Sequence, residues 1–309
     1  MQNLDLLKKR FRIFRIVRDF FYSKGLSEVD CPLASKSRIV EPNIDLVPVF
    51  VNGDKRWLCP SPEVGMKKLL AEGMENIFQL SSVFRNGEYG EKHSSEFTLL
   101  EWYRVGISFE EIIEETTELI HLVCGYFPAH ACTYASLFEQ HFQINPHTCN
   151  REDLILIFEK NGFETYPGLI EAPKSDMLNF LMGSHIEPRF PSDQITIVTD
   201  YPAHQTLMSR LKVIDGYEVA IRFEIYLKGI ELANGSQEET KHERQIKEIQ
   251  EKYHDYTKRT EESIVLDESF LKALTKGLPE CCGVALGMDR LCMIALGAKT
   301  IDEVRIPSY

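Results

Sequence analysis

The stretch FRNGEYGEKHSSEFTLLEWYR, residues 84–104, decides how the rest of the chain is interpreted. One β-prone run enters it at residues 77–85, a second ends it at residues 96–104, and the segment between them is rich in Gly, Glu, Lys, His and Ser. This pattern predicts an antiparallel hairpin with a long, charged loop. An ordinary hairpin loop has about two to five residues, and a longer one is more often functional.

Side chains alternate across a strand, so each strand of this hairpin presents polar and apolar groups on one face. The expected faces are Phe97, Leu99, Glu101 and Tyr103 on one strand, and Gln79, Ser81, Val83 and Arg85 on the other. A carboxylate, a phenol and a guanidinium beside apolar neighbours indicate polar groups that converge on a half-buried floor. A surface hairpin with solvated charges is the alternative, and this stretch alone does not exclude it.

Composition argues against several classes of protein. The chain has 309 residues, and its 47 acidic residues against 35 basic ones give a formal net charge of −12. This balance disfavours broad, non-specific nucleic-acid binding but leaves room for a local basic pocket for ATP. No apolar run is long enough for a membrane span, and basic residues interrupt the N-terminal apolar runs, so no signal peptide is expected. The eight cysteines form no C-x-x-C pair, which favours free thiols in a reducing cytoplasm over a zinc site.

Start and stop signals place helices and strands around the hairpin. Residues 4–24 predict an amphipathic helix that ends at Gly25, and Ser61 is expected to cap a helix that ends at Gly73. Further helices are predicted at 108–126, which opens with a capping box, and at 150–160, 174–182 and 239–260, with strands at 27–31 and 194–199. The middle of the chain contains no motif that indicates chemistry.

The stretch YEVAIRFEIYLKGIELANG, residues 217–235, alternates apolar and polar residues and predicts a long strand with one buried face. If the alternation continues through Gly229, Glu231 falls on the apolar side, where an unpaired carboxylate costs on the order of several kcal/mol. A bulge at Gly229 that rotates Glu231 outward is the alternative. Glu231 and Glu238 would suit Mg²⁺, which takes about one or two carboxylates together with substrate phosphates.

The stretch CGVALGMDR, residues 282–290, predicts a strand of small residues that ends at Gly287, followed by an apolar helix that ends at Gly297. Arg290 falls in the first turn of that helix, where a cation is unfavourable with the helix dipole unless an anion binds there. In company with Arg85 and Glu231, this arrangement indicates a site for a charged ligand.

Together these stretches resemble the three motifs of class II aminoacyl-tRNA synthetases: residues 25–32 resemble motif 1, residues 84–101 motif 2, and residues 283–290 motif 3. HSSEFTLLEWYR and KGIELANG are similar to the lysine-specific branch, and the whole chain resembles the elongation factor P–(R)-β-lysine ligases, short paralogues of lysyl-tRNA synthetase. The resemblance implies an α+β fold, an antiparallel sheet flanked by helices, and a single catalytic domain over residues 1–309. Because the motif 1 helix begins at residue 4, we expect no N-terminal OB-fold for the anticodon.

The resemblance also implies a reaction and its partners. ATP, with Mg²⁺, would activate a lysine-type amino acid, lysine or (R)-β-lysine, as an aminoacyl-adenylate. The acyl group would then pass to a lysine side chain of elongation factor P. The enzyme would be a cytoplasmic homodimer with no membrane partner, and tRNA is not expected as a partner.

By the same resemblance, Arg85 would contact the α-phosphate and Arg290 the γ-phosphate of one ATP, with Glu231 as a further catalytic group. Glu231 and Glu238 would hold Mg²⁺. The remaining contacts to ATP would come from Asn86, Gly87, Ser94, Leu232 and Gly287, and the amino acid would be bound by Ser61, Glu63, Glu101, Tyr103 and Glu238.

Some positions depart from the family pattern. Family members have Arg-Asn-Glu where this chain has Arg85-Asn86-Gly87, and Glu88 would replace the missing glutamate if the loop shifts by one residue at Gly87. Ser94 stands where an asparagine is usual. Two alternative functions therefore remain: an enzyme that acylates tRNA or a small amine, and a non-catalytic protein that binds lysine and ATP.

Overall fold

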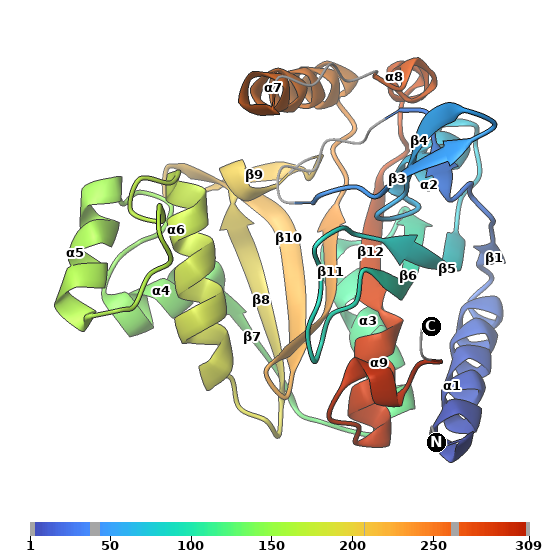
Figure 1. Ribbon diagram of the computed structural model, residues 1–309, viewed down its shortest axis with the longest axis horizontal. Helices are drawn as coiled ribbons and strands as arrows, with labels where there is room; N and C mark the ends of the chain where they lie inside the picture. The colour runs from blue at the N-terminus through green and yellow to red at the C-terminus, as the bar shows by residue number, and fades with distance from the viewer. Residues whose placement is uncertain (1–3, 38–43, 207, 261–265, 307–309) are drawn as a thin grey trace. The chain divides into compact units, whose positions relative to one another are not determined.

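The computed structural model describes residues 4–37, 44–206, 208–260 and 266–306. The chain forms two compact units (Figure 1): the first unit consists of residues 1–126 and 237–309, and the second unit of residues 127–236. Both units combine helices with a largely antiparallel sheet, and the predicted α+β class is confirmed. The single catalytic domain over residues 1–309 stays a prediction.

The main sheet of the first unit has the strand order β1-β5-β6-β12, and its centre is the predicted hairpin. β5 and β6 pair in antiparallel register, with Gln79 opposite Glu101 and Val83 opposite Phe97, so the expected shared face is confirmed. β12 is antiparallel to β6, and β1 is parallel to β5. These strands are β1 (Ser27–Glu28), β5 (Ile77–Phe84), β6 (Glu96–Val105) and β12 (Cys281–Gly287); a smaller sheet contains β2 (Ala34–Ser35), β3 (Pro48–Val51) and β4 (Asp54–Leu58).

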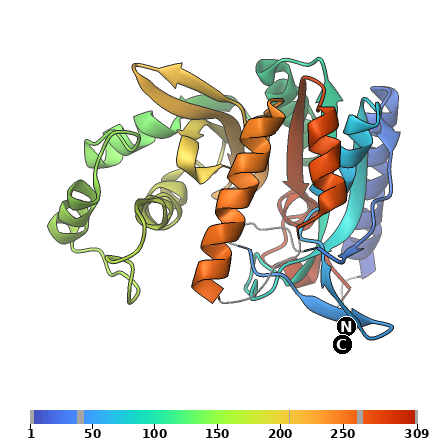
Figure 2. The same ribbon diagram turned by 90° about the horizontal axis from the view of Figure 1, so that it is seen from above.

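The helices of the first unit form two groups. α1, α3 and α9 contact one another, whereas α2 packs against α8, which lies beside it in Figure 2 and also contacts α7. None of the helices in the described ranges is long and apolar enough to cross a membrane. The helices are α1 (Leu4–Ser23), α2 (Glu63–Ala71), α3 (Phe109–Cys124), α7 (His242–Thr260), α8 (Glu268–Lys276), α9 (Met288–Leu296) and the 3-10 turn η4 (Ile301–Glu303).

The apolar stripe of α1 packs onto the central hairpin. Phe21, which is fully buried, stacks on Phe78 of β5 with ring centres 5.0 Å apart and contacts Trp102 of β6 at 5.1 Å. Large buried aromatic rings contribute strongly to such a core. The first helix is therefore fixed against the two strands that carry the candidate site.

Two predictions about helix starts had different outcomes. The capping box of α3 is confirmed, because the Ser108 hydroxyl accepts from the Glu111 N–H at 3.1 Å and the Glu111 carboxylate accepts from the Ser108 N–H at 2.8 Å. The prediction that Ser61 is the N-cap of α2 is wrong: Pro62 occupies that position, without a side-chain cap. The Ser61 hydroxyl accepts only a long bond, 3.3 Å, from the Glu63 N–H, since the rigid proline ring takes the cap position.

The second unit contains the strand order β11-β10-β8-β7, with β9 paired to β10. Its helices α4, α5 and α6 pack with β8 and β10 around a core that includes Phe138, Leu154, Leu178, Val198 and Ala220. The elements are β7 (Ala129–Thr133), α4 (Tyr134–Phe142), α5 (Arg151–Asn161), α6 (Lys174–Leu181), the π-turn η1 (Met182–Ile186), the 3-10 turns η2 (Glu187–Arg189) and η3 (Ala203–Gln205), β8 (Ile195–Pro202), β9 (Leu211–Ile214), β10 (Tyr217–Leu227) and β11 (Ile230–Gln237).

The expectation that one long strand carries Glu231 on its apolar side is wrong. The chain reverses at Lys228 and Gly229, whose φ angles of 54° and 67° form a tight turn, and Glu231 lies on the returning strand opposite Tyr226. Tyr226 shares a face with Arg222 and Glu224, which alternate with the apolar residues of β10. Glu231 therefore lies on the polar face of the hairpin, where the charge of Arg222 acts on it.

Candidate active site

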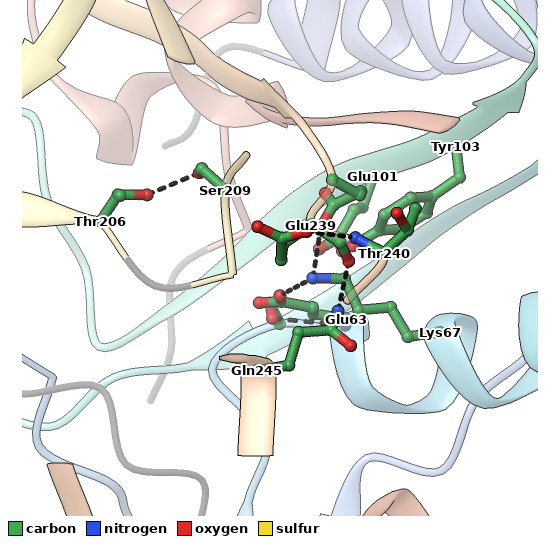
Figure 3. A network of polar contacts seen from close by, with 11 residues as sticks. Glu63, Lys67, Glu101, Tyr103, Thr206, Ser209, Glu239, Thr240 and Gln245 are labelled. Atoms are coloured by element: carbon green, nitrogen blue, oxygen red, sulfur yellow. Dashed lines mark hydrogen bonds and ion pairs between the residues drawn. The ribbon is translucent and has the colours of Figure 1, made fainter. Parts of the chain in front are cut away.

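A buried lysine lies at the centre of a cluster of carboxylates in the first unit (Figure 3). Lys67, on α2, is 1% exposed, and its Nζ lies 2.5 Å from Oε1 of Glu63 and 2.7 Å from Oε2 of Glu238. Burial opposes the ammonium, but the charges of Glu238 and Glu63 outweigh it and raise the pKa of Lys67 above its ordinary value. Lys67 is therefore a permanent cation.

Glu101 and Tyr103 face this cluster from β6. Oε1 of Glu101 accepts a hydrogen bond from the Tyr103 hydroxyl at 2.8 Å, whereas the buried Oε2 has no hydrogen-bond partner among the residues that the structure describes. Burial, together with the charge of Glu63, raises the pKa of Glu101 to about 8. Burial, together with the charge of Glu101, also raises the pKa of Tyr103 well above its ordinary value. Glu101 thus carries a proton at neutral pH, and a cation placed beside its buried Oε2 would favour the ionised form.

Local structure explains why these groups meet. Glu63 opens α2 and Lys67 follows one turn later, so both side chains lie on one face of the helix. The Glu238 N–H donates to the carbonyl of Cys281 on β12 at 3.0 Å, which places Glu238 beside the strand that pairs with β6. The structure therefore brings together Glu63, Glu101, Tyr103 and Glu238, which were predicted from the sequence as amino-acid ligands.

The segment after Glu238 is held by its own polar contacts, also drawn in Figure 3. Oε1 of Glu239 accepts from the backbone N–H groups of Thr240 and Lys241 at 2.9 and 3.0 Å, and Nε2 of Gln245 donates to the Glu239 carbonyl at 2.5 Å. Nη1 of Arg244 lies 3.3 Å from Oε2 of Glu239. These contacts engage the carboxylate of Glu239. Of the two consecutive glutamates, Glu238 is therefore the one that contacts Lys67.

Arg85 enters the loop of the β5–β6 hairpin at the end of β5. Its backbone N–H donates to the Ser95 carbonyl at 2.9 Å, and its guanidinium carbon lies 5.0 Å from the centre of the Phe97 ring. Nη1 of Arg85 lies 3.5 Å from Oε1 of Glu88. The glutamate that follows Gly87 therefore turns back toward Arg85, and Gly87 allows this because its φ of 78° is in the left-handed region.

Arg290 approaches the same loop from the first turn of α9. Its Nε donates to the Lys92 carbonyl at 3.4 Å, and its Nη2 lies 2.5 Å from Nε2 of His93. The side chain also runs over Gly287, where an added Cβ would lie 3.7 Å from Cδ of Arg290. Both predicted phosphate-binding arginines thus contact residues 92–97, one from the position just after β5 and the other from α9.

Two further arginines of this region were missed by sequence reasoning. Nη1 of Arg305 donates to the hydroxyl of Ser94 at 2.6 Å, so the predicted ATP ligand Ser94 is held by the C-terminal segment. Nη1 of Arg10, on α1, lies 2.5 Å from Oδ1 of Asp289, and Oδ2 of Asp289 accepts from the Thr98 N–H at 2.7 Å. Asp289 directly precedes Arg290, so this buried pair fixes the start of α9. No local sequence signal marks either contact, because the partners are far apart along the chain.

Lys67 was also missed, although a signal was present. The spacing between Glu63 and Lys67 is the four-residue step that brings oppositely charged side chains together on a helix. Lys68 follows directly and pairs with Asp267 at 2.7 Å, at 31% exposure. From the sequence, the two lysines are indistinguishable. Only the packing of α2 shows that one of them is buried.

The other predicted ATP ligands are placed as follows. Asn86 donates its backbone N–H to the Asp45 carbonyl at 2.7 Å, beside Arg85. Glu231 and Leu232 belong to the second unit, where Glu231 is partly exposed and Leu232 is buried. Their contacts with ATP stay predictions.

The described residues do not form a ready-made metal centre. Within residues 4–37, 44–206, 208–260 and 266–306, no three or more His, Cys, Asp or Glu side chains are grouped so as to hold a metal ion. A Mg²⁺ ion fits here only as a companion of ATP, because about one or two carboxylates and the phosphates suffice for it. The contact with Lys67 favours an amine-binding role for Glu238.

Comparison with known proteins gives consistent results. The family model described as tRNA synthetases class II (D, K and N) matches residues 2–306. The elongation factor P–(R)-β-lysine ligase of Mannheimia succiniciproducens is 34% identical over 307 residues, which cover 97% of this chain and 94% of the relative. The proteins of the same name from Avibacterium paragallinarum and Histophilus somni (strain 2336) are 36% and 37% identical, each with coverage of 98% of this chain and 94% of the relative. The resemblance predicted from the motifs is confirmed.

Proposed function

The chain belongs to the family of class II tRNA synthetases (D, K and N), and from this premise we propose that it is an ATP-dependent ligase. It would activate (R)-β-lysine, or lysine as the related alternative, and transfer the acyl group to a lysine side chain of elongation factor P. The names of its relatives support this choice of substrate and acceptor.

One observation carries the proposal: the candidate site already stabilises an ammonium group. Glu63 and Glu238 hold the buried Nζ of Lys67 within 2.7 Å, and Oε2 of Glu101 is buried beside them. An ammonium removed from water must be paired with carboxylates, which are the groups that a diamino acid needs. This arrangement supports a lysine-type substrate over a neutral amino acid.

In the first step, a carboxylate oxygen of the amino acid attacks the α-phosphorus of ATP. The bond between the α- and β-phosphates breaks, pyrophosphate leaves and an aminoacyl-adenylate forms. Arg85 stabilises the charge that develops on the α-phosphate, and Arg290 holds the γ-phosphate. Asn86, Gly87, Ser94, Leu232 and Gly287 are the proposed further contacts to ATP, and Ser61 and Tyr103 are the proposed further contacts to the amino acid.

In the second step, the ε-amine of a lysine on elongation factor P attacks the acyl carbon of the adenylate. An amide bond forms, the bond from acyl carbon to phosphate oxygen breaks, AMP leaves and the amine loses a proton. The chain's own residues act by binding and orientation, and no covalent enzyme nucleophile is needed. Mg²⁺, with Glu231 as its proposed carboxylate, would neutralise phosphate charge. We further propose a cytoplasmic homodimer.

The test is the intact mass of elongation factor P after incubation with the protein, ATP and either (R)-β-lysine or L-lysine. The proposal requires a mass increase equal to one lysyl residue with at least one isomer, and AMP release in equal amount. Transfer of label to tRNA instead of protein would favour the tRNA-acylating alternative. No pyrophosphate exchange with either isomer would favour the non-catalytic alternative.

A further inference from the structure

Lys67 has no assigned role in the proposed reaction, although it is the most deeply placed charge of the site. It is 1% exposed, whereas its neighbour Lys68 is 31% exposed in its side chain. A buried lysine is costly unless it is paired, so its position requires the two carboxylates that it contacts. Those carboxylates, Glu63 and Glu238, are the proposed ligands of the amino acid. The cation therefore belongs to the pocket and not to the packing of α2 alone.

The contacts of Lys67 use only part of each carboxylate. Nζ contacts Oε1 of Glu63 and Oε2 of Glu238, that is, one oxygen of each carboxylate, and a carboxylate has two oxygens that can accept hydrogen bonds. The ammonium bridges a helix residue, Glu63, and a loop residue, Glu238, that the backbone alone would not hold together. It thus acts as a pin between α2 and the segment that follows β11.

The charges of the pocket can be counted from the groups that face Glu101. These are Glu63 and Lys67 from α2, Tyr103 from β6 and Glu238 from the segment after β11. With Tyr103 neutral, three carboxylates and one ammonium leave two negative charges when Glu101 is ionised. A lysine-type amino acid carries two ammonium groups. Lys67 therefore matches the charge of the site to a diamino acid, whose two ammonium groups balance the two remaining negative charges.

We propose that Lys67 is a positioning residue that holds Glu63 and Glu238 in the geometry for a diamino acid. It also neutralises one of the three carboxylates, because the two ammonium groups of the substrate balance only the other two. This inference rests on the proposed function, because it concerns the amino-acid pocket of that reaction. Lys67 does not touch the substrate's reacting atoms; it acts through the two carboxylates.

The test compares K67M with K68M, which removes the next lysine on the same helix but leaves the pocket cluster unchanged. Pyrophosphate exchange is measured with (R)-β-lysine and L-lysine at varied concentrations, and again at varied ATP. We expect K67M to raise the KM for the amino acid about tenfold or more, since the buried Glu238 and the half-buried Glu63 lose their shared partner, and to leave the KM for ATP within about twofold. K68M is expected to keep both constants within about twofold of the wild type.

A purely structural role would change both constants together or only the yield of folded protein, so the split between them is the decisive readout. A second readout is pH: the charge of Lys67 favours the ionised form of Glu101, so K67M shifts the pH at which amino-acid binding improves to a higher value. K67R, which keeps the charge, should recover most of the lost affinity for the amino acid.

If K67M does not fold, as judged by circular dichroism, the double variant K67M/E238Q replaces it. The double variant removes both members of the buried ion pair, so it leaves no uncompensated charge at Glu238. Compared with E238Q alone, it must show a further increase in the KM for the amino acid, because Glu63 has also lost its partner. An unchanged or lower KM in K67M, or equal values in E238Q and the double variant, overturns the proposal. Wild-type protein without any exchange activity would instead contradict the proposed function.

Discussion

Gly283 lies directly opposite Tyr103 in the β6–β12 pair, and a Cβ at position 283 would lie 2.4 Å from Cε1 of the tyrosine ring and 2.8 Å from Oε1 of Glu238. Both distances are shorter than real side chains tolerate, so the absent side chain leaves the space in which Tyr103 and Glu238 lie. The glycine is therefore part of the candidate site through the space it leaves for these two side chains.

We expect G283A to raise the KM for the amino acid about tenfold or more while the KM for ATP changes little, because Tyr103 and Glu238 must both move. Steady-state pyrophosphate exchange measures both constants. G183A is the matched control, since a Cβ at that glycine would meet nothing within 4 Å. Equal KM values in G283A and wild type would show that Tyr103 and Glu238 do not bind the amino acid.

Glu101 predicts a pH dependence of substrate binding. Its pKa is about 8, and a cationic substrate favours the ionised form, so the KM for (R)-β-lysine should fall as the pH rises toward that value and level off above it. Between about pH 6.5 and about pH 8.5 we expect a change of roughly 25-fold, the ratio of the ionised fractions of Glu101 at the two pH values. E101Q should have a high KM that does not change over this range. A similar pH profile in both proteins would assign the titration to another group.

The same carboxyl predicts the sign of a stability change. Its pKa in the folded protein lies above the ordinary value of 4.5, so the folded state binds the proton more tightly than the unfolded state. This contribution to stability is complete below pH 4.5 and is lost as the pH rises through about 8. E101Q should therefore gain stability over wild type at about pH 9, by on the order of a few kcal/mol, and little at about pH 4.5. Urea unfolding at the two pH values measures the difference.

Glu88 tests the departure from the family pattern at Gly87. Its carboxylate already turns back to Arg85, at 3.5 Å, and we expect it to serve the nucleotide in place of the missing glutamate. E88A should raise the KM for ATP by about three- to tenfold, the loss of one charged hydrogen bond. E91A, an exposed glutamate in the same loop, is the control. Unchanged exchange kinetics in E88A would rule out this substitute role.

The buried pair of Arg10 and Asp289 predicts a loss of both stability and ATP affinity. Their side chains are 7% and 2% exposed, and removal of one partner from such a pair costs about 3–5 kcal/mol. R10M should therefore lower the free energy of unfolding by that amount and raise the KM for ATP, because Asp289 positions Arg290. The control is R15M, whose partner Asp19 and own side chain are 68% and 84% exposed, and it should change stability by less than about 1 kcal/mol. Equal effects of the two variants would contradict this reading.

Local patterns in the sequence predicted much of this fold. Alternation correctly predicted the faces of β5 and β6, the capping box at Ser108 correctly predicted the start of α3, and the helix expected at 150–160 is α5. The prediction for Glu231 was wrong because it continued the alternation of residues 219–227 through Lys228 and Gly229, whereas the apolar positions change parity there, to Ile230 and Leu232, as the two-residue turn places them. Alternation shows which residues share a face of a strand, but it does not by itself show whether the chain continues or reverses.

The residues of the candidate site were largely predicted from the sequence, but the contacts between their side chains were not. The family resemblance implied Glu63, Glu101 and Glu238, yet the lysine that links two of them has the local sequence of a surface helix. Contacts between Arg305 and Ser94, or between Arg10 and Asp289, depend on tertiary packing that no window of sequence contains. Ion pairs and hydrogen bonds between residues far apart along the chain could therefore not be predicted from local sequence.

The contact between Arg10 and Asp289 has a consequence for biosynthesis. Asp289 is translated long after Arg10, and at about 5 to 20 residues per second the wait between them is about 15 to 60 s. During that time the nascent first helix carries a guanidinium whose buried partner does not yet exist. The end of α9 that we propose to bind the nucleotide can therefore mature only after Asp289 has been translated.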